Sequence, residues 1–185
     1  MISIKFMKIL LVNGSHRAGN TDLVLARVVV KLESLNIEYR QLILRDIEMK
    51  YPDGCEDCAN LLPCPHILDQ FALEIEPTLR DYDLYIITTP TYCDAITPLL
   101  KTFFDRIVFW CHEDRNYWSG KKMALIAHGM ADEHSWSSIE SWLQGVCRWS
   151  ECQYQGSLQF HSDSKVGQID LTEEQIDQFI QKITN

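Results

Sequence analysis

The chain has 185 residues, 46% hydrophobic and 23% charged, which predicts one globular domain, residues 1–185, with a sizeable core. Its formal net charge of −9 repels phosphate backbones, so we expect no nucleic-acid partner. No apolar run is long enough to span a bilayer, and residues 1–7 lack the features of a signal peptide, so we expect no membrane partner. These observations favour a cytoplasmic protein whose seven cysteines are reduced thiols or ligands.

Strand-like apolar runs alternate with helix-like segments along the chain. The pattern predicts strands at 8–13, 37–44, 84–89, 123–127 and 153–160, and helices at 21–35, 69–80, 98–110, 135–149 and 172–183. Thr97 and Pro98 form a helix cap and a first-turn proline, and Thr172 with Gln175 has the pattern of a capping box. A strand followed by a helix, five times, predicts an α/β fold with a doubly wound, five-stranded parallel sheet. Five strands suit the flavodoxin-like order 2-1-3-4-5.

A polar segment, residues 14–22, joins the first strand to the first helix. Ligands of such sheets bind at the carboxyl ends of the strands, next to the point where the strand order reverses, and this segment follows the first strand there. Free N–H groups and the dipole at the start of the helix favour an anion. Ser15, Asn20 and Thr21 add neutral donors, and Arg17 adds a bidentate cation. The segment therefore suits a phosphate ester, and the alternative is a capped turn that binds nothing.

Two later segments end at the same edge of the predicted sheet. Residues 88–98 follow the third strand and offer the rigid Pro90, the aromatic Tyr92 and several backbone N–H groups, which suit a flat heteroaromatic ring. Residues 128–132 follow the fourth strand. The segment after the first strand has neither the Gly-Lys-Ser/Thr of a Walker A loop nor the Gly-x-Gly-x-x-Gly of a dinucleotide fold. The three segments together predict a mononucleotide site.

Three motifs in this order resemble the NADPH-dependent FMN reductase family. They are Gly14-Ser15-x-Arg17 with Asn20-Thr21, then Thr89-Pro90-Thr91-Tyr92, then Leu99 to Arg106. The resemblance covers roughly residues 6 to 130, and within the family the chain is most similar to the branch that contains the iron–sulfur flavoproteins. It implies a flavodoxin-like fold, bound FMN, NAD(P)H as co-substrate, and a homodimer or homotetramer with the flavin near a subunit interface.

The resemblance also implies a role for individual residues. By position, the FMN phosphate would be held by Ser15, Arg17, Asn20 and Thr21. The ribityl chain and isoalloxazine would be lined by Pro90, Thr91, Tyr92, Cys93 and Asp94, and the pyrimidine side of the ring by His128 and Gly129. Three features depart from the family pattern. Cys93-Asp94 replaces a frequent aromatic residue or glycine, residues 128–132 have less glycine than is frequent there, and His16 replaces a frequent proline.

The resemblance implies an enzyme whose chemistry resides in FMN, so we expect no catalytic side chain. FMN accepts a hydride at N5 and passes on one or two electrons. We expect an NAD(P)H-dependent oxidoreductase that delivers electrons to a small-molecule acceptor such as a quinone, a flavin or a nitro- or azo-aromatic compound. One alternative is a non-enzymatic, flavodoxin-like electron carrier, although Arg17 places a cation where flavodoxins favour uncharged residues. Another is a metal or thiol redox module.

Residues 46–68 interrupt the alternation with a polar, proline-containing loop that carries Cys55, Cys58, Cys64 and His66. Cys-x2-Cys is the usual start of a metal or cluster site. The iron–sulfur flavoproteins hold their cluster with Cys-x2-Cys-x2-Cys and a fourth cysteine further on. Here Leu61 takes the third position and Cys64 follows too early for the fourth, so we expect no cluster. The alternatives are a Cys3His zinc site made of these four residues and a Cys55–Cys58 disulfide. We favour a loop that binds no metal.

Overall fold

The computed structural model describes residues 7–57, 59, 60, 62, 64–66, 68–130 and 133–184, except the side chains of residues 109, 110, 112 and 133–135. It contains one five-stranded sheet made of β1 (Lys8–Asn13), β2 (Glu38–Ile43), β3 (Leu84–Pro90), β4 (Lys122–Gly129) and β5 (Gln153–His161). The strand order is β2-β1-β3-β4-β5, and all neighbouring strands are parallel. The predicted fold and strand order are confirmed.

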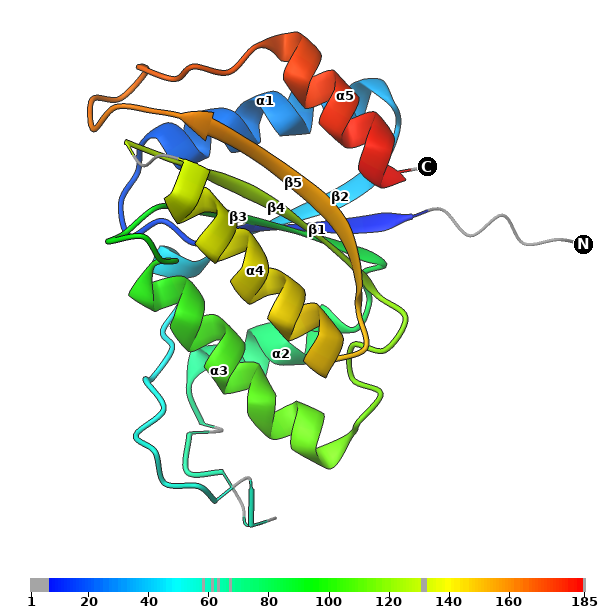
Figure 1. The fold of residues 1–185 in the computed structure, drawn as a ribbon. Coiled ribbons are helices and arrows are strands. Elements are labelled where there is room, and N and C mark those ends of the chain that lie inside the picture. Colours follow the sequence, from blue (N-terminus) through cyan, green and yellow to red (C-terminus); the bar gives the residue numbers. More distant parts are fainter. Residues whose placement is uncertain are drawn as a thin grey trace, which may run out of the picture.

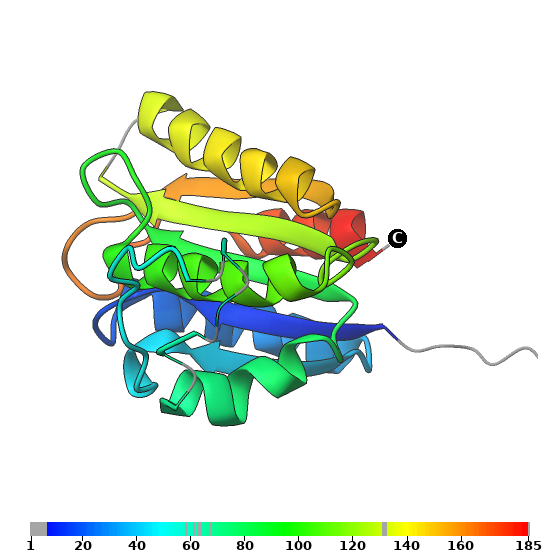
Figure 2. The ribbon, with the colours of Figure 1, turned by 90° about the horizontal axis from the view of Figure 1, so that it is seen from below.

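Helices cover both faces of the sheet. Figure 1 shows α1 (Asn20–Ser34) and α5 (Glu173–Thr184) on one face, and α2 (Glu76–Leu79), α3 (Pro98–Glu113) and α4 (Glu133–Trp149) on the other. No helix in the described part of the chain has the length and apolar character needed to cross a membrane. Figure 2 shows the same layers from below, with the loops after β1, β3 and β5 together at one edge of the sheet.

The alternation of side chains along the strands creates two separate cores. In β1, Ile9 and Leu11 pack under α1 and α5, whereas Leu10 and Val12 face α3 and α4. The same alternation holds in β3 and β4, because successive side chains of a strand point to opposite faces. A strand buried on both faces must be apolar at nearly every position, which explains the continuous apolar runs in the sequence.

Most predicted elements are observed, with boundaries that differ by a few residues. The two predicted caps are confirmed, because Leu100 N donates to Thr97 Oγ1 (3.1 Å) and Gln175 N donates to Thr172 Oγ1 (3.2 Å). The second predicted strand is shorter and is followed by a 3₁₀ turn at Leu44–Asp46.

The helix predicted over residues 69–80 is observed over residues 70–79, but its first half is π-helical and not α-helical. Residues Phe71–Ile75 form a π-helical turn, and the regular α2 follows for four residues only. Pro77 lies in this segment and has no N–H to bond a preceding carbonyl, so a continuous α-helical ladder cannot form there. Phe71, Ile75 and Leu79 are nevertheless buried together, as their helical spacing predicts.

Candidate functional site

A cavity of about 320 Å³ lies at the carboxyl edge of the sheet, within the size range of small-molecule sites. Segments that follow β1, β3, β4 and β5 form its wall. The wall contains all of the cofactor-binding residues expected from the sequence: Ser15, Arg17, Asn20, Thr21, Pro90, Thr91, Tyr92, Cys93, Asp94, His128 and Gly129. It also contains Gly19 and Met130, which belong to the predicted segments 14–22 and 128–132, and Ser162, Asp163, Ser164 and Val166, which sequence reasoning did not single out.

The segment after β1 is tied to its neighbours by backbone contacts that require a glycine. Gly14 N donates to Thr88 O (2.8 Å), and Thr97 Oγ1 donates to Gly14 O (2.6 Å). A Cβ at Gly14 would lie 3.0 Å from Leu100 Cβ and 3.1 Å from the Thr88 carbonyl oxygen. No larger residue fits without a shift of the β3 backbone or the start of α3. These contacts tie the loop to β3 and to the start of α3.

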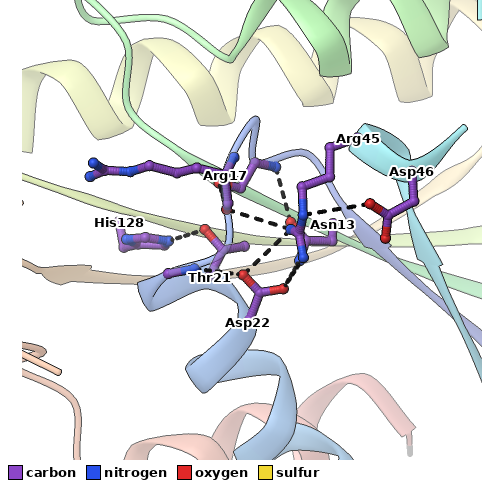
Figure 3. Close-up of polar contacts among 9 residues, drawn as sticks. Asn13, Arg17, Thr21, Asp22, Arg45, Asp46 and His128 are labelled. Carbon is purple, nitrogen blue, oxygen red and sulfur yellow. Dashed lines mark hydrogen bonds and ion pairs between the residues drawn. The ribbon is translucent and has the colours of Figure 1, made fainter. Parts of the chain in front are cut away.

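The start of α1 is held from one side by a charged cluster. Asp22 accepts a hydrogen bond from Gly19 N (2.8 Å), which caps the helix, and another from Asn13 Nδ2 (3.1 Å). Arg45, which follows β2, donates to both oxygens of Asp22, at 2.7 Å and 3.4 Å. Figure 3 shows Asp22 directed toward Asn13 and Arg45, on the other side of the helix start from His128. The helix start is therefore capped through Gly19 and Asp22.

The other side of the helix start contacts a buried histidine. His128 Nε2 lies 2.9 Å from Thr21 Oγ1, and His128 Nδ1 lies 2.8 Å from Ser162 Oγ. The ring stacks on Phe160, with centroids 5.3 Å apart and planes 7° apart, and the residue is 3% exposed. Burial lowers the pKa of His128 to about 4, so the ring is neutral at physiological pH. The sequence placed His128 beside a flavin ring, and in the structure both of its nitrogens face hydroxyls.

The segment after β5 closes the cavity and uses two of the residues expected to bind phosphate. Asn20 Nδ2 donates to Asp163 O (2.9 Å) and Lys165 O (3.2 Å), and Asn20 Oδ1 accepts from Gly167 N (2.8 Å). Arg17 Nη2 donates to Ser164 O (3.3 Å) and is otherwise exposed to solvent. The Asn20 amide is thus occupied by the loop, while the Arg17 guanidinium keeps most of its donors for a ligand. The position of this loop was predictable, because the fifth parallel strand ends at the same edge as the others.

The segment after β3 forms a tight turn at the mouth of the cavity. Tyr92 and Ala95 exchange backbone hydrogen bonds of 2.9 and 3.0 Å, and Cys93 and Asp94 between them have φ of 46° and 61°. Two successive positive φ values define a type I′ turn, which favours Asn and Gly. Such strain in non-glycine residues is concentrated at functional sites. The Tyr92 ring is 41% exposed and lies 5.8 Å from the ring of His16, so an aromatic pair stands at the entrance.

Gly129 joins the β4 and β3 segments. Thr91 N donates to His128 O (2.8 Å), and Ser162 N donates to Gly129 O (2.9 Å). A Cβ at Gly129 would lie 2.1 Å from Thr91 Oγ1, a distance that no side chain could adopt. Gly129 therefore permits the close approach of these three segments, and its role is to shape the wall.

The cysteine loop brings together a mixed set of metal ligands. Asp53, Cys55 and His66 each offer a ligand atom, all within 4.8 Å of one another, and His66 Nε2 lies 3.3 Å from Asp53 Oδ1. Hydrogen bonds from His66 and Cys55 hold the pKa of the Asp53 carboxyl below its usual value. Cys64 is not part of this group, and Cys58 lies outside the described residues. A [4Fe–4S] cluster takes four thiolates, so the set that the described residues bring together does not fit one.

The end of this loop is anchored to α3 by a buried ion pair. Arg106 donates to both carboxylate oxygens of Asp69 through Nη1 and Nη2, and both side chains are almost completely buried. Arg106 also donates to the carbonyl oxygens of Lys50 (3.1 Å) and His66 (2.6 Å). Burial alone would raise the pKa of Asp69, but the Arg106 guanidinium and two backbone N–H groups lower it below its usual value. Arg106, part of the third sequence motif, thus stabilises the loop.

Comparison with known proteins extends these observations. The family model described as NADPH-dependent FMN reductase matches residues 7–167. The chain is 30% identical over 100 residues to an iron–sulfur flavoprotein of Archaeoglobus fulgidus, covering 54% of this chain and 48% of that protein. It is 31% identical over 101 residues to an iron–sulfur flavoprotein of Methanocaldococcus jannaschii, covering 54% and 51%. The chain therefore spans about half the length of the curated relatives it matches.

Solved structures share the fold at low sequence identity. RosB with a bound 8-demethyl-8-formylriboflavin-5′-phosphate has a TM-score of 0.69 at 17% identity, covering 95% of this chain and 76% of that one. An NADH:FMN oxidoreductase in its apo form has a TM-score of 0.60 at 16% identity, covering 96% and 87%. Flavodoxin 1 of Bacillus cereus has a TM-score of 0.59 at 14% identity, covering 94% and 92%. These similarities show that the fold is flavodoxin-like.

Proposed function

The chain belongs to the NADPH-dependent FMN reductase family, and on that premise we propose that it is an FMN-dependent oxidoreductase which takes electrons from NADH or NADPH. The observation that carries the proposal is the composition of one cavity. Its wall includes the start of α1 with Arg17, which suits a phosphate, and the turn around Tyr92, which suits a flat ring. A flavin mononucleotide has these two parts, joined by a polar chain.

The residues of the cavity fit FMN chemically. The first N–H groups of α1 have no partner within the helix, and the dipole adds positive potential there. Arg17 supplies a charged, bidentate donor. Asp22, the acidic residue nearest this loop in sequence, is turned toward Arg45 and does not line the cavity. Thr91, Asp94 and Ser162 add polar groups to the wall.

The protein contributes binding, orientation and control of water, and FMN supplies hydride and electron transfer when it is bound. The neutral ring of His128 and the close contacts at Gly14 and Gly129 keep the wall rigid. The residues of the Tyr92–Ala95 turn are exposed, and we expect a flat donor or acceptor to reach the cofactor from this side. We propose a quinone, a flavin or a nitro- or azo-aromatic compound as the acceptor class.

The phosphate contact can be tested by comparing FMN with riboflavin. Arg17→Ala is expected to weaken FMN binding by about 1.5–3 kcal/mol, roughly 10- to 100-fold, because it removes a charged hydrogen-bond donor. Riboflavin, which has no phosphate, should bind both proteins equally. Arg148→Ala, at an exposed arginine near the end of α4, is the matched control and should change neither affinity. Equal affinity of the unchanged protein for FMN and riboflavin would refute the phosphate site.

The reaction can be tested on the FMN-loaded protein without oxygen. Addition of NADH or NADPH should bleach the bound flavin, and steady-state rates with a quinone acceptor should give parallel double-reciprocal lines, as expected for a ping-pong mechanism. A flavin that neither nucleotide bleaches would support the alternative function of an electron carrier. That alternative is consistent with the net charge of −9, since flavodoxins are acidic.

We also propose that the chain acts as a cytoplasmic homodimer or homotetramer. An apolar cavity of about 470 Å³ adjoins the first one, since Asp94 lines both, and its wall includes Ile96, Ile139 and Trp142. Trp149, further along α4, is 50% exposed. Apolar surface of this kind favours association. Sedimentation equilibrium would measure the assembly state, and a monomer at all concentrations would refute the proposal.

A further inference from the structure

A buried chain of hydroxyl and imidazole groups leads from the loop after β5 to the cavity. Ser162 Oγ lies 2.8 Å from His128 Nδ1, and His128 Nε2 lies 2.9 Å from Thr21 Oγ1. All three residues are at most 4% exposed, and Thr21 and Ser162 line the cavity. Figure 3 shows the Thr21 hydroxyl pointing to the His128 ring at the start of α1.

The chain of hydrogen bonds has two arrangements because His128 is neutral. A neutral imidazole carries one N–H and one bare nitrogen, so it donates on one side and accepts on the other. If the proton is on Nδ1, His128 donates to Ser162 and accepts the hydroxyl hydrogen of Thr21. If it is on Nε2, Ser162 donates to His128, and His128 donates to Thr21. Burial of the ring disfavours the doubly protonated form that would donate on both sides.

Only the second arrangement leaves the Thr21 hydroxyl hydrogen free for a ligand. In the first, Thr21 presents lone pairs to the cavity, which repel an anion. In the second, the Thr21 oxygen accepts from Nε2–H and its hydrogen can point to an anionic oxygen. We propose that His128 is a positioning residue that makes Thr21 a phosphate donor, and that a bound phosphate selects the Nε2–H tautomer.

The other neutral side chains of the loop already have partners for their donors. The Ser15 hydroxyl donates to Arg17 O (2.8 Å), and the Asn20 amide donates to Asp163 O and Lys165 O. Thr21 is therefore the neutral side chain of the first loop whose donor can be turned to a ligand by a change of tautomer alone. The inference rests on the proposed function, because it takes the ligand to be a phosphate ester at the start of α1.

The first experiment measures phosphate recognition as the ratio of the dissociation constants of riboflavin and FMN. Thr21→Val removes the hydroxyl at nearly constant shape and should lower this ratio about tenfold, whereas Thr21→Ser should keep it. A general loss of structure would weaken both ligands alike and leave the ratio unchanged.

Two substitutions of His128 separate its two nitrogens. The amide nitrogen of glutamine can take the place of Nε2, so His128→Gln should retain the bond to Thr21 and most of the ratio. The shorter asparagine can replace only Nδ1, so His128→Asn should lower the ratio about tenfold. In a Thr21→Val background, His128→Asn should cause no further loss, because the hydroxyl that it orients is absent. Losses that multiply in the double variant would overturn the proposal.

The second experiment observes the tautomer directly by nitrogen NMR of the imidazole in the full-length protein. Protonated and bare ring nitrogens resonate in separate ranges, so spectra identify which nitrogen of His128 carries the proton. In the FMN complex the ring proton of His128 should be on Nε2. In the riboflavin complex His128 should have the same tautomer as in the ligand-free protein. An FMN complex with the proton on Nδ1 would overturn the proposal.

The two proposals fail in different ways. If neither Thr21→Val nor Arg17→Ala changes the ratio of dissociation constants, the phosphate site itself is wrong. If Arg17→Ala lowers the ratio and Thr21→Val does not, the phosphate site stands and the role of His128 is wrong.

Discussion

Acid should destabilise this fold in a way that depends on His128. The pKa of His128 is lowered to about 4 in the folded protein, whereas an unfolded chain has a histidine pKa of about 6.5. Between these values the unfolded state binds a proton that the folded state does not, so the free energy of unfolding falls as the pH falls. The neutral His128 contributes about 3 kcal/mol to the free energy of unfolding at high pH, and about 2 kcal/mol of this contribution is lost between pH 7 and pH 4.5.

Chemical denaturation followed by tryptophan fluorescence measures this loss. It should be done on FMN-free protein, because a ligand that binds only the folded state adds its own stabilisation. Carboxylates also titrate in this range, so His128→Gln is the control, since glutamine has no proton to gain. Between pH 7 and pH 4.5 the unchanged protein should lose about 2 kcal/mol more than the variant does. Equal losses in the two proteins would refute the assignment of a buried, neutral imidazole.

Three further predictions concern the loops. Arg106→Leu should lower the free energy of unfolding by about 3–5 kcal/mol, because it leaves the buried Asp69 without its counter-charge. Cys93→Gly should raise the free energy of unfolding by about 0.5–1 kcal/mol, because Cys93 has φ of 46°, and the same change at Cys152, which lacks a positive φ, should not. Elemental analysis of protein purified with and without oxygen should find no stoichiometric iron with labile sulfide. Finding both would contradict our expectation, and stoichiometric zinc would instead indicate a metal site at the group around Cys55 and His66.

The fold was predictable because burial on both faces of a parallel sheet produces a simple signal. The runs at β1, β3 and β4 are apolar at almost every position, and the helices between them have apolar residues at helical spacing. The π-helical bonding within the helix predicted over residues 69–80 was not predictable in this way. Phe71, Ile75 and Leu79 have the spacing of a helix and lie on a buried face, but spacing reports which face is buried and not how the backbone is bonded. The backbone there is set by Pro77.

The candidate site was predictable to the level of the segments that form it, and less so for the role of each side chain. Every expected residue lines the cavity, because the carboxyl ends of parallel strands must meet at one edge. The segment of Ser162–Val166 follows the same rule and was missed, because its residues carry no motif. Contacts between segments distant in the sequence, such as Thr21 with His128, have no local pattern that predicts them.

The first loop shows why residue type alone does not identify a ligand. Asn13, Asn20 and Asp22 carry polar groups, as Arg17 and Thr21 do. In the structure, however, the side chains of Asn13, Asn20 and Asp22 hold the loop in place. Asp22 would repel a phosphate if it faced the cavity, and it is instead turned away and neutralised by Arg45. Since a buried polar group needs partners, the residues that complete one another's hydrogen bonds become the framework. What remains for a ligand is the start of α1, the guanidinium of Arg17 and one hydroxyl whose direction His128 sets.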